Sequence, residues 1–264
     1  MGLFDDELEI IKTFQKVQTT SVCLIPPADA ECKNIFDVIH EQDQWANWIN
    51  SSGKGDPPPD FFSDKYGLMM EVMRVDDHGH IGKNKRSIVN PTLQREAKVT
   101  RELKEKGIFD MFPNAKFFPI VDTKLPTKED HNYIYYRDNF IRTIENHKNK
   151  IRAYQRNHPN HKTVFLVFDE SSPYFQIESE KYPRKIGAPV SGRPHIWFFD
   201  KAFMEHVLDS EIDYLIWFTP WKHCEMYTIT GKRCSLPRAT MINVHKMEQH
   251  LLEYNVEKME STEL

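Results

Sequence analysis

The chain has 264 residues, a formal net charge of −4, 39% hydrophobic residues and 28% charged residues. A chain of this length and balance can bury a hydrophobic core, which excludes intrinsic disorder as its main state. The small negative charge excludes a protein that coats nucleic acid with its whole surface, although it permits local basic patches. No apolar run approaches the ~20 residues that span a bilayer, and the acidic start of the chain is unlike a secretory signal. We therefore expect a cytoplasmic protein with no membrane partner.

The first sixty residues predict helix, strand, helix and loop, in that order. Apolar residues recur at helical spacing over residues 3 to 18, and residues 21 to 27 resemble a short strand that two prolines end. A second helix is expected from Asn34 to Asn50 and carries Glu41. Residues 51 to 59 are rich in Gly, Ser and Pro, which predicts a loop.

The most informative stretch is a predicted strand from Leu68 to Val75, which has a carboxylate near its middle. Because side chains alternate along a strand, Met69, Glu71 and Met73 share one face. A carboxylate within such an apolar run costs free energy unless it is paired, hydrogen-bonded or bound to a metal. Glu71 is therefore a candidate functional residue, and Asp60 precedes it after a run of prolines.

A turn-like segment rich in possible metal ligands follows this strand. It contains Asp76, Asp77, His78 and His80. These side chains could bind a divalent ion, since imidazole and carboxylate groups suit several metals. An exposed hairpin turn explains the same residues, and both interpretations stay open.

Basic residues outnumber acidic ones between positions 83 and 106, although the whole chain is acidic. A helix is expected from Pro91 to Lys106, with a basic stripe along one face. Such a stripe can neutralise phosphates and make nucleic-acid binding salt-dependent, or it can simply keep a helix face in water. The candidate nucleic-acid-binding residues are Lys83, Lys85, Arg86, Arg95, Lys98 and Arg101.

The remaining elements predict an α/β fold. Residues 107 to 131 look irregular, and a helix is expected from Asn132 to Arg156. Residues Thr163 to Phe168 are apolar throughout, which predicts a central strand. The later elements are expected to be a strand at 195–199, a helix at 201–208, a strand at 214–218, a closing helix at 241–252 and a polar tail at 253–264. We expect one α/β domain, residues 1 to 252, with a central mixed sheet flanked by helices.

Pro59-Asp60 together with Glu71-Val72-Met73 resembles the motif of the PD-(D/E)xK superfamily of metal-dependent nucleases. In that superfamily a Pro-Asp and an acidic-x-Lys on neighbouring strands build a magnesium site. The resemblance covers roughly residues 31 to 170 and implies a restriction-endonuclease-like core, which residues 195 to 252 would extend. It also implies Mg²⁺ or Mn²⁺ as cofactor, held by Asp60, Glu71 and Glu41, and DNA as partner.

The sequence departs from the motif at Met73, which stands where the superfamily has lysine. A thioether can neither polarise an attacking water nor stabilise developing negative charge. Some members carry the catalytic lysine on the helix after the acidic strand, and Lys148 or Lys150 would serve in that way here. We expect a magnesium-dependent nuclease that hydrolyses phosphodiester bonds in DNA. The alternatives are an inactive nuclease-fold protein that binds nucleic acid or protein, and an α/β protein with no nucleic-acid role.

Overall fold

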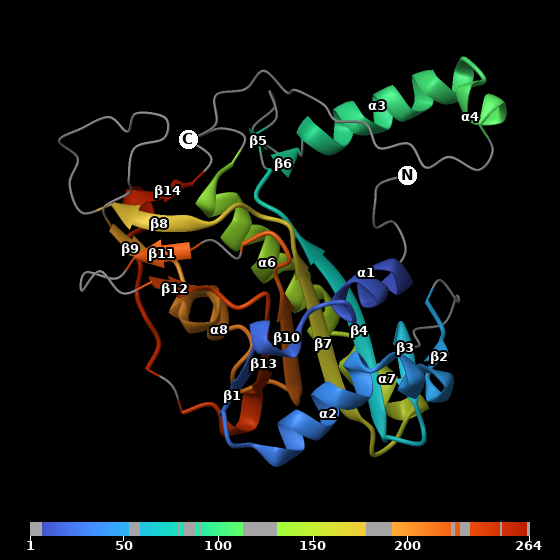
Figure 1. The fold of residues 1–264 in the computed structure, drawn as a ribbon, viewed down its shortest axis with the longest axis vertical. Helices are drawn as coiled ribbons and strands as arrows, with labels where there is room; N and C mark the ends of the chain where they lie inside the picture. Colours follow the sequence, from blue (N-terminus) through green and yellow to red (C-terminus); the bar gives the residue numbers. More distant parts are fainter. Residues whose placement is uncertain are drawn as a thin grey trace.

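The fold is organised around a mixed seven-stranded sheet with the strand order β1-β13-β10-β7-β4-β3-β2 (Figure 1). The computed structural model describes residues 7–52, 59–78, 80–81, 88–89, 91–112, 131–177, 192–222, 225–227, 233–248 and 250–262. The strands of this sheet are β1 (Val22–Ile25), β2 (Ile49–Asn50), β3 (Phe61–Ser63), β4 (Leu68–Val75), β7 (Lys162–Asp169), β10 (Tyr214–Phe218) and β13 (Ala239–Asn243).

Three parallel strands occupy the centre of the sheet. β7 pairs in parallel with β4 on one side and with β10 on the other. β2, β3 and β4 form an antiparallel meander at one end. At the other end β13 runs antiparallel to β10 and parallel to β1. The predicted central strand is confirmed as β7, and the predicted strand with Glu71 is confirmed as β4.

Helices cover both faces of the sheet, which confirms an α/β fold with a central mixed sheet (Figure 1). α1 and α2 pack on one face, and α6, α7 and α8 pack on the other. The described helices are α1 (Glu7–Phe14), α2 (Ala30–His40), α3 (Pro91–Glu105), α4 (Ile108–Met111), α6 (Tyr133–Lys148), α7 (Ile151–Asn157) and α8 (Lys201–Met204). None of them is both long and apolar enough to cross a membrane.

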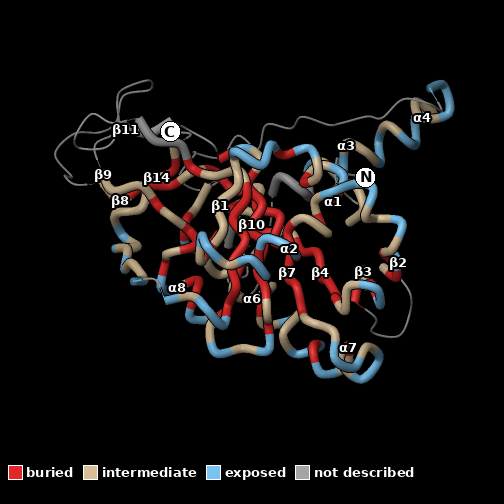
Figure 2. Tube along the Cα trace, turned by 60° about the horizontal axis from the view of Figure 1, so that its bottom comes forward, coloured by how far each residue is buried: buried red, intermediate tan, exposed pale blue. Residues whose placement is uncertain are grey.

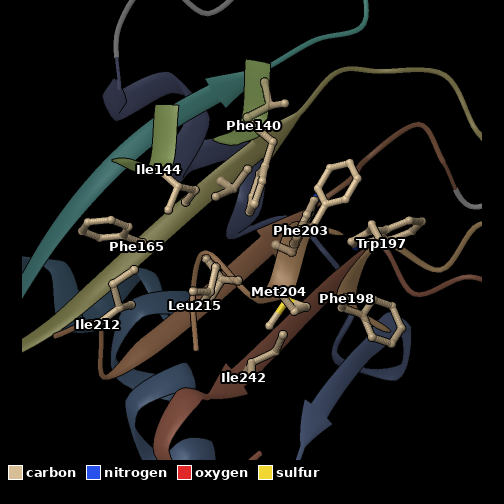
Figure 3. Close-up of a cluster of buried hydrophobic side chains, with 14 of the residues drawn as sticks. Phe140, Ile144, Phe165, Trp197, Phe198, Phe203, Met204, Ile212, Leu215 and Ile242 are labelled. Atoms are coloured by element: carbon tan, nitrogen blue, oxygen red, sulfur yellow. The ribbon is translucent and has the colours of Figure 1, made fainter. Parts of the chain in front are cut away.

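Alternation along the central strands divides the core into two layers. On β7, Phe165 and Val167 face α6 and α8, whereas Val164, Leu166 and Phe168 face α1 and α2. β7, β10 and β13 are buried along nearly their whole length (Figure 2). Aromatic and aliphatic side chains from α6 and α8 interdigitate with those of the strands (Figure 3). On β4, Met69 and Met73 lie in the layer under α6, so Glu71 between them points toward the same helix.

Two predicted helices have different bounds in the structure. The helix expected at 34–50 begins at Ala30, because the Asp29 side chain caps it, and it ends at His40. Residues Gln42–Asn47 then form a 3₁₀ helix. The helix expected at 132–156 is divided into α6 and α7, with a break at Asn149 and Lys150.

Two of the C-terminal predictions were wrong, and the tail contains an element that was not expected. Residues 195–199 are not a strand, since Trp197–Phe199 form a 3₁₀ helix. The helix expected at 241–252 begins instead with strand β13, which is fully buried between β1 and β10. The tail at 253–264 contains a further strand, β14. For β13 and β14, pairing partners from other parts of the chain decided the backbone conformation.

Shorter strands form three small sheets beside the main one. β8 lies between β9 and β14, β11 pairs with β12, and β5 pairs with β6. Their bounds are β5 (His80–Ile81), β6 (Ile88–Val89), β8 (Tyr174–Ile177), β9 (Gly192–Pro194), β11 (Glu225–Tyr227), β12 (Arg233–Ser235) and β14 (Met259–Ser261). α3 and α4 extend away from the main sheet (Figure 1).

Candidate functional site

The structure brings Asp60 and Glu71 together where β3 and β4 separate. Phe61 pairs with Met70, so Asp60 and Glu71 form the next opposed position of this antiparallel pair. Opposed residues of such a pair have Cβ atoms about 5 Å apart. Asp60 Oδ2 accepts a hydrogen bond of 2.8 Å from the backbone N–H of Val72. The carboxylate thus continues the ladder of β4 in place of a backbone carbonyl.

Glu71 is buried, with 3% of its surface exposed, and His147 of α6 is its basic partner. His147 Nδ1 lies 2.6 Å from Glu71 Oε2. The hydroxyl of Tyr154 in α7 belongs to the same region, because burial and the charge of Glu71 raise its pKa. The Glu71 carboxylate is therefore held in a defined position by groups from the helices that cover this face.

Burial and the charge of Glu71 together raise the pKa of Asp60 to about 7. The N–H of Val72 opposes this shift but does not cancel it. Two adjacent carboxylates with restricted access to water are costly to ionise together, unless a cation lies between them. Mg²⁺ prefers oxygen ligands and is commonly held by one or two carboxylates, so this donor set fits it.

Other residues that the sequence assigned to this site lie elsewhere. Glu41 is exposed at the end of α2, and among the described residues its side chain makes no hydrogen bond or ion pair to Asp60 or Glu71. Lys148 Nζ donates to Glu145 Oε1 at 2.9 Å and to the carbonyl of His206 at 2.8 Å. Lys150 is exposed at the start of α7.

Met73, at the motif position for lysine, is 3% exposed and belongs to the apolar layer under α6. The basic group at Glu71 is instead His147, which the sequence analysis did not select. A signal for it exists in the sequence. The apolar stripe of Tyr136, Phe140 and Ile144 continues at position 147, so this residue faces the sheet, whereas Lys148 is turned aside.

The structure describes only some of the residues in the predicted basic stripe. Arg95, Lys98 and Arg101 are exposed on α3, which confirms the helix expected there. Lys98 forms an ion pair of 4.0 Å with Glu102, and both side chains are largely exposed. Such a pair is weak in water and leaves the stripe accessible. Lys83, Lys85 and Arg86 lie outside the described residues.

At the carboxyl end of β7 lies a buried ion pair that the sequence analysis missed. Asp169 Oδ2 accepts hydrogen bonds from Lys222 Nζ at 2.7 Å, Tyr136 Oη at 2.6 Å and Trp217 Nε1 at 2.9 Å. The side chains of Lys222 and Asp169 are 1% and 0% exposed. The Lys222 ammonium also lies 4.2 Å from the Tyr136 ring centroid. This complete set of partners indicates a role in fixing the ends of the strands.

A second buried network lies in the same region. His195 Nε2 is 2.7 Å from Asp200 Oδ2, which also accepts a hydrogen bond from the Tyr133 hydroxyl. Burial lowers the pKa of His195, although the hydrogen bond and charge of Asp200 oppose the shift. Asp200 additionally caps α8 through the N–H of Ala202. These contacts join α6 to α8 and have no direct connection with Asp60.

Comparison of this chain with known protein families, with curated proteins and with solved structures finds no match.

Proposed function

We propose that this protein is a magnesium- or manganese-dependent nuclease that hydrolyses phosphodiester bonds in DNA, with Asp60 and Glu71 as the metal ligands. The observation that carries the proposal is the close pair of carboxylates, of which Glu71 is buried and Asp60 is partly buried; the pKa of Asp60 is raised to about 7 by burial and by Glu71. A cation between the two groups would remove their mutual repulsion.

The order of elements supports the same assignment. A helix (α2), a three-stranded meander (β2, β3 and β4), a helix (α6) and a strand parallel to β4 (β7) occur in this order along the chain. This is the order that a restriction-endonuclease-like core requires. The elements β5, β6, α3 and α4 are inserted between β4 and α6, and α7 precedes β7. Asp60 directly precedes β3 and Glu71 lies on the neighbouring strand β4, which supports the motif that the two residues resemble.

Each residue of the site would have a separate role in such a reaction. A bound Mg²⁺ would lower the pKa of a water molecule and stabilise charge on the phosphate oxygens. Val72 orients Asp60 through its N–H, and His147 orients Glu71 through Nδ1. We assign to His147 the position of the basic group beside the acidic pair, since Met73 is buried in the core and Lys148 is bonded to Glu145 and His206.

Cleavage of linear and plasmid DNA with Mg²⁺ or Mn²⁺ tests the proposal. We expect wild type to cleave and Glu71→Gln and Asp60→Asn to lose about 100-fold or more, because each removes a ligand charge. Asp43→Asn is the matched control, since it makes the same chemical change at an exposed position. Unchanged cleavage by Glu71→Gln, or no cleavage of any DNA by wild type with either ion, would overturn the proposal.

A second candidate function is nucleic-acid binding without cleavage, and the burial of Met73 favours it. In this case the exposed cations of α3 would bind phosphates. Replacing Arg95, Lys98 and Arg101 by Gln should flatten the salt dependence of DNA binding, by about 0.9 in the log–log slope for each phosphate that the protein no longer neutralises. DNA binding without cleavage selects this function, whereas no binding at all selects an α/β protein with no nucleic-acid role.

A further inference from the structure

Two histidines and an aspartate meet beyond the carboxyl end of β4. Asp77 and His78 lie two and three residues after the end of β4, and His131 immediately precedes the N-cap of α6. An isolated antiparallel bridge pairs His78 with His131, and the N–H of Asn132 donates to the carbonyl of Asp77. The backbone therefore fixes the two imidazoles next to each other, with ring centroids 4.6 Å apart.

The Asp77 carboxylate is fully buried and held in one orientation. Its Oδ2 accepts hydrogen bonds from the N–H of Ser172 at 3.0 Å, the Ser172 hydroxyl at 2.7 Å and the Tyr174 hydroxyl at 2.6 Å. The Ser172 hydroxyl is itself 2.7 Å from the hydroxyl of Ser261 in β14. Donors that hold one carboxylate oxygen in this way are typical of the partners that orient metal ligands.

The same carboxylate also faces the two imidazoles. His131 Nδ1 is 3.2 Å from both Oδ1 and Oδ2, and His78 Nε2 is 4.0 Å from Oδ1. All three ligand-type atoms lie within 4.8 Å of one another. In a tetrahedral site with bonds of 2.0–2.2 Å, the ligand atoms are about 3.3 to 3.6 Å apart. The spacing in the structure thus needs only small side-chain rotations to fit one ion.

The solvent exposure of the two imidazoles and the carboxylate of Asp77 also suit a bound metal ion. The His78 and His131 side chains are 23% and 15% exposed, so the cluster reaches solvent on the side of the imidazoles. At its buried end the cluster presents the Asp77 carboxylate, an oxygen ligand of the kind that Zn²⁺ binds.

We propose that Asp77, His78 and His131 form a site for a transition-metal ion of the Zn²⁺ type, separate from the acidic pair of Asp60 and Glu71. Two imidazole nitrogens and one carboxylate oxygen favour Zn²⁺ over Mg²⁺, which prefers oxygen ligands alone. Three protein ligands leave a coordination position open for water or a substrate atom. The site does not depend on the proposed nuclease activity.

The test is Zn²⁺ titration of the full chain after removal of metals by a chelator, with Co²⁺ as the spectroscopic probe. We expect one equivalent of Zn²⁺ to bind, and Co²⁺ to give the absorption spectrum of a site with nitrogen and oxygen ligands. His78→Ala and His131→Ala should each weaken this binding by about 100-fold. Asp43→Asn, which changes an exposed carboxylate outside both proposed sites, should leave it unchanged.

The chain offers a matched control at the opposite end of β4. Asp64, His158 and His161 also place their ligand-type atoms within 4.8 Å of one another, but Asp64 is exposed. His158→Ala and His161→Ala should retain the binding of the first equivalent. If these variants lose it while His131→Ala keeps it, the proposed assignment is wrong.

Folding of the variants is checked by circular dichroism, and Asp77→Asn provides a variant of nearly equal shape. If His131→Ala does not fold, the ¹⁵N shifts of the histidines in wild type decide the question, because coordination moves His78 Nε2 and His131 Nδ1 on addition of Zn²⁺. Absence of stoichiometric Zn²⁺ or Co²⁺ binding by wild type, or binding that leaves these two nitrogens unshifted, would reduce the cluster to an ion pair between His131 and Asp77 and overturn the proposal.

Discussion

The sharpest prediction concerns Asp60→Asn, which should make the protein more stable at alkaline pH. The pKa of Asp60 is about 7 in the folded protein and 3.8 ordinarily. Between these values the folded state keeps a proton that the unfolded chain has released, so stability falls as pH rises through this window. The full difference corresponds to about 4 kcal/mol. Asp60 is only partly buried, and screening by water reduces the expected gain at pH 8 to about 2 kcal/mol.

Urea denaturation at pH 4 and pH 8 measures this effect. Asn keeps an oxygen that can accept the hydrogen bond from Val72, so the substitution removes the charge with little change in shape. At pH 8 we expect the free energy of unfolding from urea to rise by about 2 kcal/mol, and a parallel thermal melt should show a melting temperature higher by about 4 to 8 °C. The difference from wild type should shrink toward zero at pH 4, where Asp60 holds its proton in the folded protein. Mg²⁺ should stabilise wild type at pH 8 more than the variant, since it relieves the same repulsion.

Asp43→Asn provides the control for a general effect of removing one negative charge, because Asp43 is exposed. It should have the same stability as wild type at both pH values. Equal stabilisation of Asp60→Asn at pH 4 and pH 8 would contradict the electrostatic explanation. No stabilisation at pH 8 would show that Asp60 and Glu71 do not repel each other in the folded protein.

Two further substitutions test the core around the site. Met73→Lys should destabilise the protein by about 3 kcal/mol, since it places an ammonium group in a position that is 3% exposed, whereas Met73→Leu should cost less than about 1.5 kcal/mol. A stable Met73→Lys protein in urea denaturation would refute this placement. Lys222→Met should cost about 3 to 5 kcal/mol, because Asp169 would be left buried without its cation. Lys201→Met, at an exposed ion pair with Glu253, should leave the unfolding curve unchanged, and an equally small effect at Lys222 would refute the role of the buried pair.

The elements that could be predicted were those with a strong local pattern. The apolar run of β7 and the run of β4 around Glu71 predicted their own conformation, and the basic helix at 91–105 followed from its spacing. β13 was missed, since its five buried residues fit a helix equally well and only its neighbours β1 and β10 make them a strand. β14 was missed for the same reason, because its partner β8 is distant in sequence.

The residues of the candidate metal site also fall into two groups, those that the sequence predicted and those that it did not. Asp60 and Glu71 are eleven residues apart in one meander, so a short pattern could place them on neighbouring strands. His147 could not be assigned to Glu71 in this way, because the contact depends on how α6 packs across the sheet. The same limit applies to His131, which reaches Asp77 only because the segment before α6 returns to the end of β4.

The sequence by itself therefore determined the class of the fold, the central strands and the two carboxylates, because alternation, helical spacing and short loops are local properties of the chain. Only the tertiary structure decided which basic group contacts Glu71 and which strands complete the sheet. The buried ion pair between Lys222 and Asp169 likewise depends on the tertiary structure. Such contacts join residues far apart in sequence, and they form because buried charges and unpaired strand edges are costly until a partner from another part of the chain satisfies them.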